Sequence, residues 1–190
     1  MLTDLNWKEL TEFGQEKFPF DDEELSIVFK LLSDREEITP RLLKIYPKLR
    51  VKVLFQDYSE LSVSEVNFLN INNQTEPVKS LVREVILHDD ETTIMFARTI
   101  VSPDSISKVK RLLETLNGKN IGKILFDKNN SFTKEKIFYQ RLNADNWLFK
   151  KADIHNDSGK NSYWSRCSVF YDNGKPAILL TDVFFETIDI

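Results

Sequence analysis

The chain has 190 residues, of which 41% are hydrophobic and 29% charged, as in a globular protein that buries a sizeable core. Its net charge of -4, with lysines and arginines scattered among acids, argues against nucleic acid as a partner. One cysteine, Cys167, and two histidines exclude an internal disulfide and leave too few soft ligands for a zinc site, so we expect no metal.

The expected cellular setting follows from what the sequence lacks. Neither a charged-then-apolar leader nor a run of about 18 apolar residues is found, which predicts a cytoplasmic protein without a membrane span. No oligomerisation motif is conspicuous, so a monomer is the default expectation. We expect one domain over residues 1–190, with an N-terminal helical layer over 1–47 and a sheet-forming core over 48–190.

The first part of the chain has helical spacing. Residues 4–17 and 21–32 carry apolar side chains on one side, which predicts two amphipathic helices. A third, short helix begins at Thr39 and ends before Pro47. Residues 49–58 then alternate as a strand does.

Two β-hairpins are predicted in the second half of the chain. Their strands cover residues 82–88 and 92–101, and residues 163–171 and 176–186. The first turn lies at Asp89 and Asp90, and the second contains Asn173-Gly174, a strong signal for a two-residue turn.

The remaining segments complete the expected architecture. Residues 105–116 predict an amphipathic helix between the hairpins. Residues 143–162 are rich in polar side chains and predict a surface excursion around buried Trp147, Leu148 and Phe149. This order of elements predicts an α+β fold, an antiparallel β-sheet with helices packed on it, largely on one face.

One carboxylate, Asp182, lies in the middle of the most apolar strand. Alternation puts Asp182 on one face with Ile178, Leu180 and Phe184. The other face is apolar too, so we expect the strand to be covered on both sides. Because a lone buried carboxylate is strongly unfavourable, Asp182 is either paired with a buried arginine or held for a ligand.

Arg83 is a candidate for the buried arginine that could pair with Asp182. In LVREVIL it shares a face with Leu81, Val85 and Leu87, which aims its guanidinium at the core. Opposite charges on the apolar faces of two strands predict a closed polar pocket that suits a small organic anion. A structural salt bridge, or a side chain bent to the sheet edge, is an equally open alternative.

Other familiar sites are missing or weak. The chain has no glycine-rich phosphate loop, nucleophile elbow, HExxH or paired-cysteine motif, and its five glycines make a dinucleotide site implausible. Cys167 fits a small packed hydrophobe better than a nucleophile. His88 and His155 lie beside acidic, turn-rich sequence and fit solvated side chains better than general bases.

Four sequence blocks follow one another along the C-terminal part of the chain. They read LVREVIL (81–87), FARTIVSPDSI (96–106), LNGKNIGKILF (116–126) and WSRCSVFYDNGKPAILLTDVFF (164–185). Together they resemble the successive blocks of the chorismate pyruvate-lyase family, also called 4-hydroxybenzoate synthase. The resemblance implies the fold of that family, conversion of chorismate to 4-hydroxybenzoate and pyruvate for quinone biosynthesis, and no cofactor.

The resemblance also implies a binding site, residue by residue. Arg83 matches the family's arginine that binds a substrate carboxylate, and Asp182 matches its substrate-binding glutamate. Ile121 falls where a leucine contributes its backbone to the ligand, and Ile38 where an apolar residue of a covering flap does so. We therefore expect these four residues to bind substrate, with Arg83 and Asp182 as the catalytic pair.

The matching blocks contain further polar residues and two departures from the family. Arg98, Arg166 and Thr181 fit a role in the sheet framework at least as well as ligand contact. Asp182 is one methylene shorter than the family's glutamate, a difference of about 1.5 Å that a water or a backbone shift can absorb. The segment 127–163 is longer than the family's.

Two alternatives stay open at the level of sequence. One is a non-catalytic effector-binding module of the same fold, as in bacterial regulators that carry a winged-helix domain upstream; the first 80 residues here lack its basic recognition helix. The other is a lyase-like protein that has lost activity or uses another aromatic acid.

Overall fold

The computed structural model describes residues 7–9, 32, 34–71, 77–90, 92–115, 120–156 and 159–185. Most of the two helices predicted near the N-terminus lies outside these residues. Within the first, Lys8–Glu9 forms a short strand, β1, so the helical prediction is wrong there. A free sheet edge supplies backbone hydrogen bonds that outweigh a weak local helical preference. Of the second, only Leu32 is described, and it is buried.

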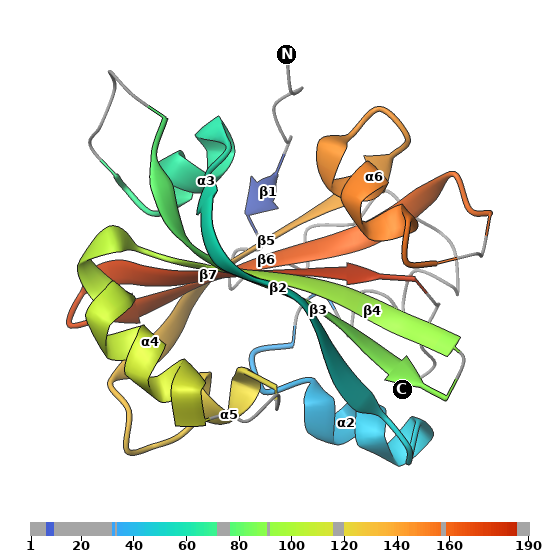
Figure 1. Ribbon diagram of the computed structural model, residues 1–190, viewed down its shortest axis with the longest axis horizontal. Helices are drawn as coiled ribbons and strands as arrows, with labels where there is room; N and C mark the ends of the chain where they lie inside the picture. Colours follow the sequence, from blue (N-terminus) through green and yellow to red (C-terminus); the bar gives the residue numbers. More distant parts are fainter. Residues whose placement is uncertain are drawn as a thin grey trace.

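The described part of the chain forms one seven-stranded sheet (Figure 1). The strands are β1 Lys8–Glu9, β2 Arg50–Glu60, β3 Lys79–Asp89, β4 Thr92–Val101, β5 Phe132–Asn143, β6 Ser162–Asp172 and β7 Lys175–Phe184. Their order is β1-β5-β6-β7-β4-β3-β2, and every neighbouring pair is antiparallel. The predicted α+β class with an antiparallel sheet is confirmed.

Helices cover both faces of this sheet. They are α2 Thr39–Ile45, α3 Val63–Phe68, α4 Ile106–Thr115 after a 3-10 turn at Pro103–Ser105, α5 Gly122–Leu125 and α6 Trp147–Asp153. Figure 1 shows α2, α4 and α5 on one side and α3 and α6 on the other. The helices predicted at Thr39 and over 105–116 are confirmed, whereas the prediction of helices largely on one face is wrong. Helices as short as α3 and α6 give too few turns for their period to be recognised.

The hairpin turns form as their residues predict. Asn173 has a φ of 51° and Gly174 a φ of 76°, and a type I′ turn requires such positive values at both positions. Asp90, in the turn between β3 and β4, has a φ of 47°. Both predicted hairpins are therefore confirmed, as β3–β4 and β6–β7.

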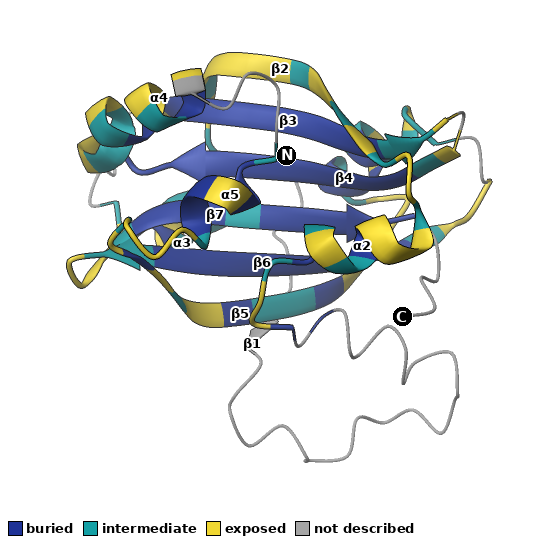
Figure 2. Cartoon of the chain, turned by 90° about the horizontal axis from the view of Figure 1, so that it is seen from below, coloured by how far each residue is buried: buried dark blue, intermediate teal, exposed yellow. Residues whose placement is uncertain are grey.

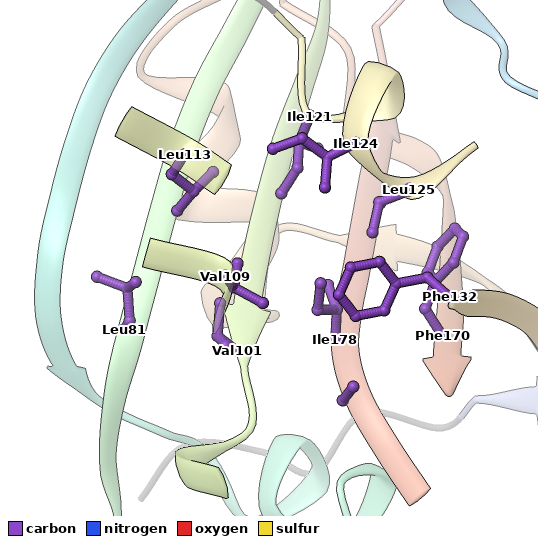
Figure 3. Close-up of a cluster of buried hydrophobic side chains, with 11 residues drawn as sticks. Leu81, Val101, Val109, Leu113, Ile121, Ile124, Leu125, Phe132, Phe170 and Ile178 are labelled. Carbon is purple, nitrogen blue, oxygen red and sulfur yellow. The ribbon is translucent and has the colours of Figure 1, made fainter. Parts of the chain in front are cut away.

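On one face of the sheet, an apolar cluster holds α4 and α5. Val109 of α4 and Ile124 of α5 belong to one cluster with Val101 and Ile178 of the sheet, and Figure 3 shows Val109 beside Val101. Val109 and Ile178 are completely buried. This packing fixes the start of α5. Ile121, directly before α5, also lines a cavity on this face of the sheet.

The opposite face has its own apolar cover. Phe96 and Val183 pack against Leu148 and Phe149 of α6. The predicted coverage of the Asp182 strand on both sides is thus confirmed, and the central strands are buried along most of their length (Figure 2). The segment 143–162 surrounds the buried residues Leu148 and Phe149 as predicted, although part of it is helical and Trp147 is half-buried.

Candidate active site

A cavity lies between the sheet and the helices α2 and α5, which are seen in front of the sheet in Figure 2. Strand alternation supplies its floor: Arg83, Val85 and Leu87 of β3, Met95, Ala97 and Thr99 of β4, Leu180 and Asp182 of β7, Arg166 of β6 and Lys134 of β5. The rim consists mainly of residues 36–39 and 120–122. The cavity contains about 520 Å³ of empty space, mouth included, a size typical of small-molecule sites.

The four residues that the sequence predicts to bind substrate all line this cavity. Arg83 and Asp182 enter from the sheet, and Ile38 and Ile121 from the rim. Their exposed fractions are between 2% and 6%, so a ligand in contact with them would be largely shielded from water. The shared polar pocket predicted from strand alternation is present; their roles in binding and catalysis remain predictions.

Asp182 pairs with Arg166, and not with Arg83. Arg166 Nη2 and Nε donate to Asp182 Oδ2 at 2.6 and 3.2 Å, and Arg166 Nη1 donates to the carbonyl of Asp34 at 3.2 Å. Arg166 stands directly opposite Asp182 on the neighbouring strand, whereas Arg83 is two strands away. Among the described residues, Asp182 Oδ1 has no hydrogen-bond partner, which leaves that oxygen for a ligand.

Arg83 is held by a polar neighbour on the edge strand. Its Nη1 donates to Oε1 of Gln56, which lies opposite Arg83 on β2. Burial lowers the pKa of Arg83, because a guanidinium loses hydration inside the protein. A planar carboxylate that matches the guanidinium fork would restore much of that lost interaction.

Lys134 is a cavity residue that the sequence analysis missed. Its Nζ donates to the carbonyls of Asp34 and Glu36 at 3.2 and 3.5 Å. Burial, together with repulsion from Arg166, lowers the pKa of Lys134 to about 7. The alternation that would reveal this position is interrupted by a bulge between Lys134 and Lys136.

The rim is tied together by polar contacts that were also missed. Asn120 Nδ2 donates to Thr39 Oγ1, and Asn120 Oδ1 accepts from the N–H of Gly122 at 3.1 Å. Glu37 lies against Gly122, and burial raises the pKa of its carboxyl. Asn120 stands within one of the four resemblance blocks, which is the signal that could have identified it.

Several residues considered at the level of sequence lie elsewhere. Arg98 lies on the opposite face of the sheet, where its Nε donates to Glu65 at 2.9 Å and its Nη1 to Glu84. Thr181 lies on that face as well, beside Cys167. Cys167 is completely buried, as expected of a packed side chain, and burial raises the pKa of its thiol.

Neither histidine lines the cavity, and both are half-buried rather than fully solvated. His155 stacks on the ring of Phe96 at 6.3 Å between centroids. Over the described ranges, no three His, Cys, Asp or Glu side chains gather in a way that could hold a metal ion. In the same ranges no helix has the length and apolar character needed to cross a membrane.

Two solved structures share the fold. The effector domain of PhnF from Mycobacterium smegmatis superposes with a TM-score of 0.56 at 13% identity, over 80% of this chain and 89% of that one. The C-terminal domain of the histidine utilization repressor from Pseudomonas syringae gives a TM-score of 0.54 at 9% identity, over 72% and 90%. At such low identity the likeness shows the fold alone.

Curated relatives are more informative. A "Probable chorismate pyruvate-lyase" from Nitrosomonas europaea is 29% identical over 157 residues, or 83% of this chain and 85% of that protein. One from Nitrosospira multiformis is 30% identical over 138 residues, or 73% and 74%. The protein-family model described as "Chorismate lyase" matches residues 20–190, and so extends well beyond the four C-terminal blocks. The chain therefore belongs to the chorismate lyase family.

Proposed function

We propose that this protein is a chorismate pyruvate-lyase that converts chorismate to 4-hydroxybenzoate and pyruvate, and that its product feeds quinone biosynthesis. The observation that carries the proposal is one shielded cavity that is lined by both a guanidinium, Arg83, and a carboxylate, Asp182. The curated relatives named as lyases support the reaction class.

The reaction needs no added reagent. The ether bond between the ring and the enolpyruvyl group breaks, and the ring carbon that bears the hydroxyl loses its hydrogen. The ring becomes aromatic, and the released enolpyruvate takes up one proton to give pyruvate. Because aromatisation supplies most of the driving force, orientation and electrostatic stabilisation are the contributions needed from the protein, and no cofactor is required.

The cavity offers a group for each of these tasks. Arg83 anchors a carboxylate of the substrate through charge-assisted hydrogen bonds. Asp182, oriented by Arg166 through Oδ2, presents Oδ1 to the ring hydroxyl or to the departing proton. Ile38, on the rim, covers the ligand and excludes water. The shorter side chain of Asp182 is accommodated by an intervening water or a shift of the ligand.

The competing effector-binding hypothesis is not favoured by the comparisons. The two similar solved structures are described as an effector domain and as a domain of a repressor, but their identities of 13% and 9% are evidence for the fold alone. The relatives with higher identity carry lyase names. A lyase also explains why a buried carboxylate, Asp182, and a buried guanidinium, Arg83, line one cavity.

Incubation of the purified protein with chorismate tests the proposal. We expect 4-hydroxybenzoate and pyruvate to appear in equal amounts. Arg83→Ala should lower kcat/KM by about 100-fold or more and weaken inhibition by 4-hydroxybenzoate, because it removes hydrogen bonds to a charged group. Arg111→Ala, at an exposed arginine of α4, is the matched control and should leave both unchanged.

Two results would reject the assignment. Unchanged kinetics of Arg83→Ala would show that Arg83 does not hold the substrate. Tight binding of 4-hydroxybenzoate by a wild-type protein that releases neither product from chorismate would favour the effector-binding hypothesis instead.

A further inference from the structure

Lys134 brings a cation to the end of the cavity opposite Arg83. Lys134 lies on β5 and Arg83 on β3, and strands β6, β7 and β4 separate them in the sheet. Four strand spacings of about 4.8 Å put the two strands at most about 19 Å apart. Since both side chains line the cavity, they approach one ligand from opposite ends.

The contacts of Lys134 leave its charge available to a ligand. Nζ donates to two backbone carbonyls, those of Asp34 and Glu36, and lies 4.9 Å from the ring centroid of Phe126 and 5.7 Å from that of Phe170. Carbonyls and aromatic rings stabilise an ammonium without neutralising it. In the part of the chain that the structure describes, no carboxylate lies within ion-pair distance of Nζ, and an ammonium has three N–H donors.

The neighbouring cation differs in this respect. Arg166 is only 2% exposed, and its guanidinium already donates to the carboxylate of Asp182 and to the carbonyl of Asp34. Its charge is compensated by Asp182 at 2.6 Å. At this end of the cavity, Lys134 is therefore the better candidate to meet an anionic group of the ligand.

We propose that Lys134 binds a second carboxylate of the substrate, the one on the enolpyruvyl side chain, while Arg83 binds the ring carboxylate. The inference rests on the proposed function, which supplies a substrate with two carboxylates separated by a ring. 4-Hydroxybenzoate has only the ring carboxylate. Lys134 therefore strengthens binding of the substrate without strengthening retention of the product, and it places positive charge beside the group that leaves.

The charge of Lys134 changes near neutral pH. The charged groups around it are Arg166 of β6, Asp182 of β7, and Asp34, Arg35, Glu36 and Glu37 of the segment before α2. Burial is the main cause that lowers its pKa to about 7, and Arg166 and Arg35 add to it against Asp182 and Asp34. Because only the protonated amine attracts a carboxylate, kcat/KM for chorismate should fall as pH rises above about 7.

Three variants test this assignment: Lys134→Gln, Lys134→Arg and the control Lys136→Gln, which removes an exposed lysine from the same strand. For each we would measure kcat/KM for chorismate from about pH 6 to about pH 9, and the inhibition constant of 4-hydroxybenzoate at one pH. Thermal unfolding of each variant confirms that it is folded.

We expect Lys134→Gln to lower kcat/KM by about 10- to 100-fold while the inhibition constant changes by less than about threefold, since only chorismate has the second carboxylate. Lys134→Arg should stay active and lose the decline above pH 7, because arginine remains protonated. Lys136→Gln should match the wild type.

The outcomes separate this inference from the function on which it rests. A wild-type protein that does not convert chorismate rejects the proposed function and this inference with it. If the wild type is active, either an unchanged kcat/KM in Lys134→Gln or an equal loss of 4-hydroxybenzoate binding overturns the assignment of Lys134 alone. A decline above pH 7 that persists in Lys134→Arg does the same.

Discussion

Arg166 and Asp182 are two buried charges that compensate each other. Each side chain is 2% exposed, so burying either charge without the other would be strongly unfavourable. Both hydrogen bonds that Arg166 donates to Asp182 reach Oδ2. The contact that compensates Asp182 therefore leaves its other oxygen, Oδ1, for the ligand contact that we propose.

Removing the cation of this pair should destabilise the fold. Arg166→Met leaves Asp182 buried without its partner and should lower the free energy of unfolding by about 3–5 kcal/mol. Lys48→Met breaks an ion pair of similar length, 2.7 Å to Asp90, whose partners are 67% and 64% exposed. That change should cost less than about 1 kcal/mol. Urea unfolding followed by circular dichroism compares the two, and equal losses would contradict the burial argument.

Some residues of the candidate site can be predicted from the sequence alone, and others cannot. Alternation within β3 and within β7 predicts that Arg83 and Asp182 enter a common pocket, and both line the cavity. It does not predict that Arg166 is the partner of Asp182, because that pairing depends on which strands are neighbours and in what register. Lys134 escapes prediction because the bulge after it breaks the period of its strand.

At the level of elements, the cavity depends on two short helices that are tied to each other. Asn120, just before α5, hydrogen-bonds Thr39 at the start of α2 and the backbone of Gly122. Glu37 packs so closely on Gly122 that a Cβ there would lie 2.8 Å from Glu37 Cγ. These contacts hold the rim residue Ile38 over the cavity.

Loss of this tie should speed release of the ligand. Asn120→Ala removes both hydrogen bonds, each contributing about 0.5–1.5 kcal/mol, so dissociation of 4-hydroxybenzoate should be about tenfold faster. Stopped-flow displacement measures that rate. Asn129→Ala, which removes an exposed contact with Asp127, is the control. If both variants release ligand at the wild-type rate, the two helices do not limit release.

Elements are predictable where a local signal is strong. Asn173-Gly174 specifies a turn by backbone preference, and Pro40 marks the first turn of α2. Helix α3 has a capping box of Ser62 and Glu65, yet it is too short for its apolar period to be recognised. Strand β1 forms only because the edge of β5 is available, which no local pattern can indicate.

The molecule as a whole divides its polar interior between the two faces of one sheet. On the face opposite the cavity, Arg98 pairs with Glu65 and Glu84, Lys151 pairs with Glu84 at 3.1 Å, and the Arg98 guanidinium lies over the ring of Trp147. Strand β4 contributes side chains to both faces. Met95, Ala97 and Thr99 line the cavity, and Arg98 belongs to the opposite face. One face therefore carries the candidate site and the other carries a buried ion network that joins α3 and α6 to the sheet.

This division predicts that stability and ligand binding can be changed separately. Arg98→Met should lower the free energy of unfolding by about 3–5 kcal/mol, because it leaves Glu65 buried without its cation and Glu84 with Lys151 alone. 4-Hydroxybenzoate at 100 times its dissociation constant should nevertheless stabilise this variant and the wild type equally, by about 2.7 kcal/mol. The same ligand concentration should give Arg83→Ala little added stability. Urea unfolding with and without ligand measures these increments, and an Arg98 variant that loses its increment would show that the two faces are coupled through β4.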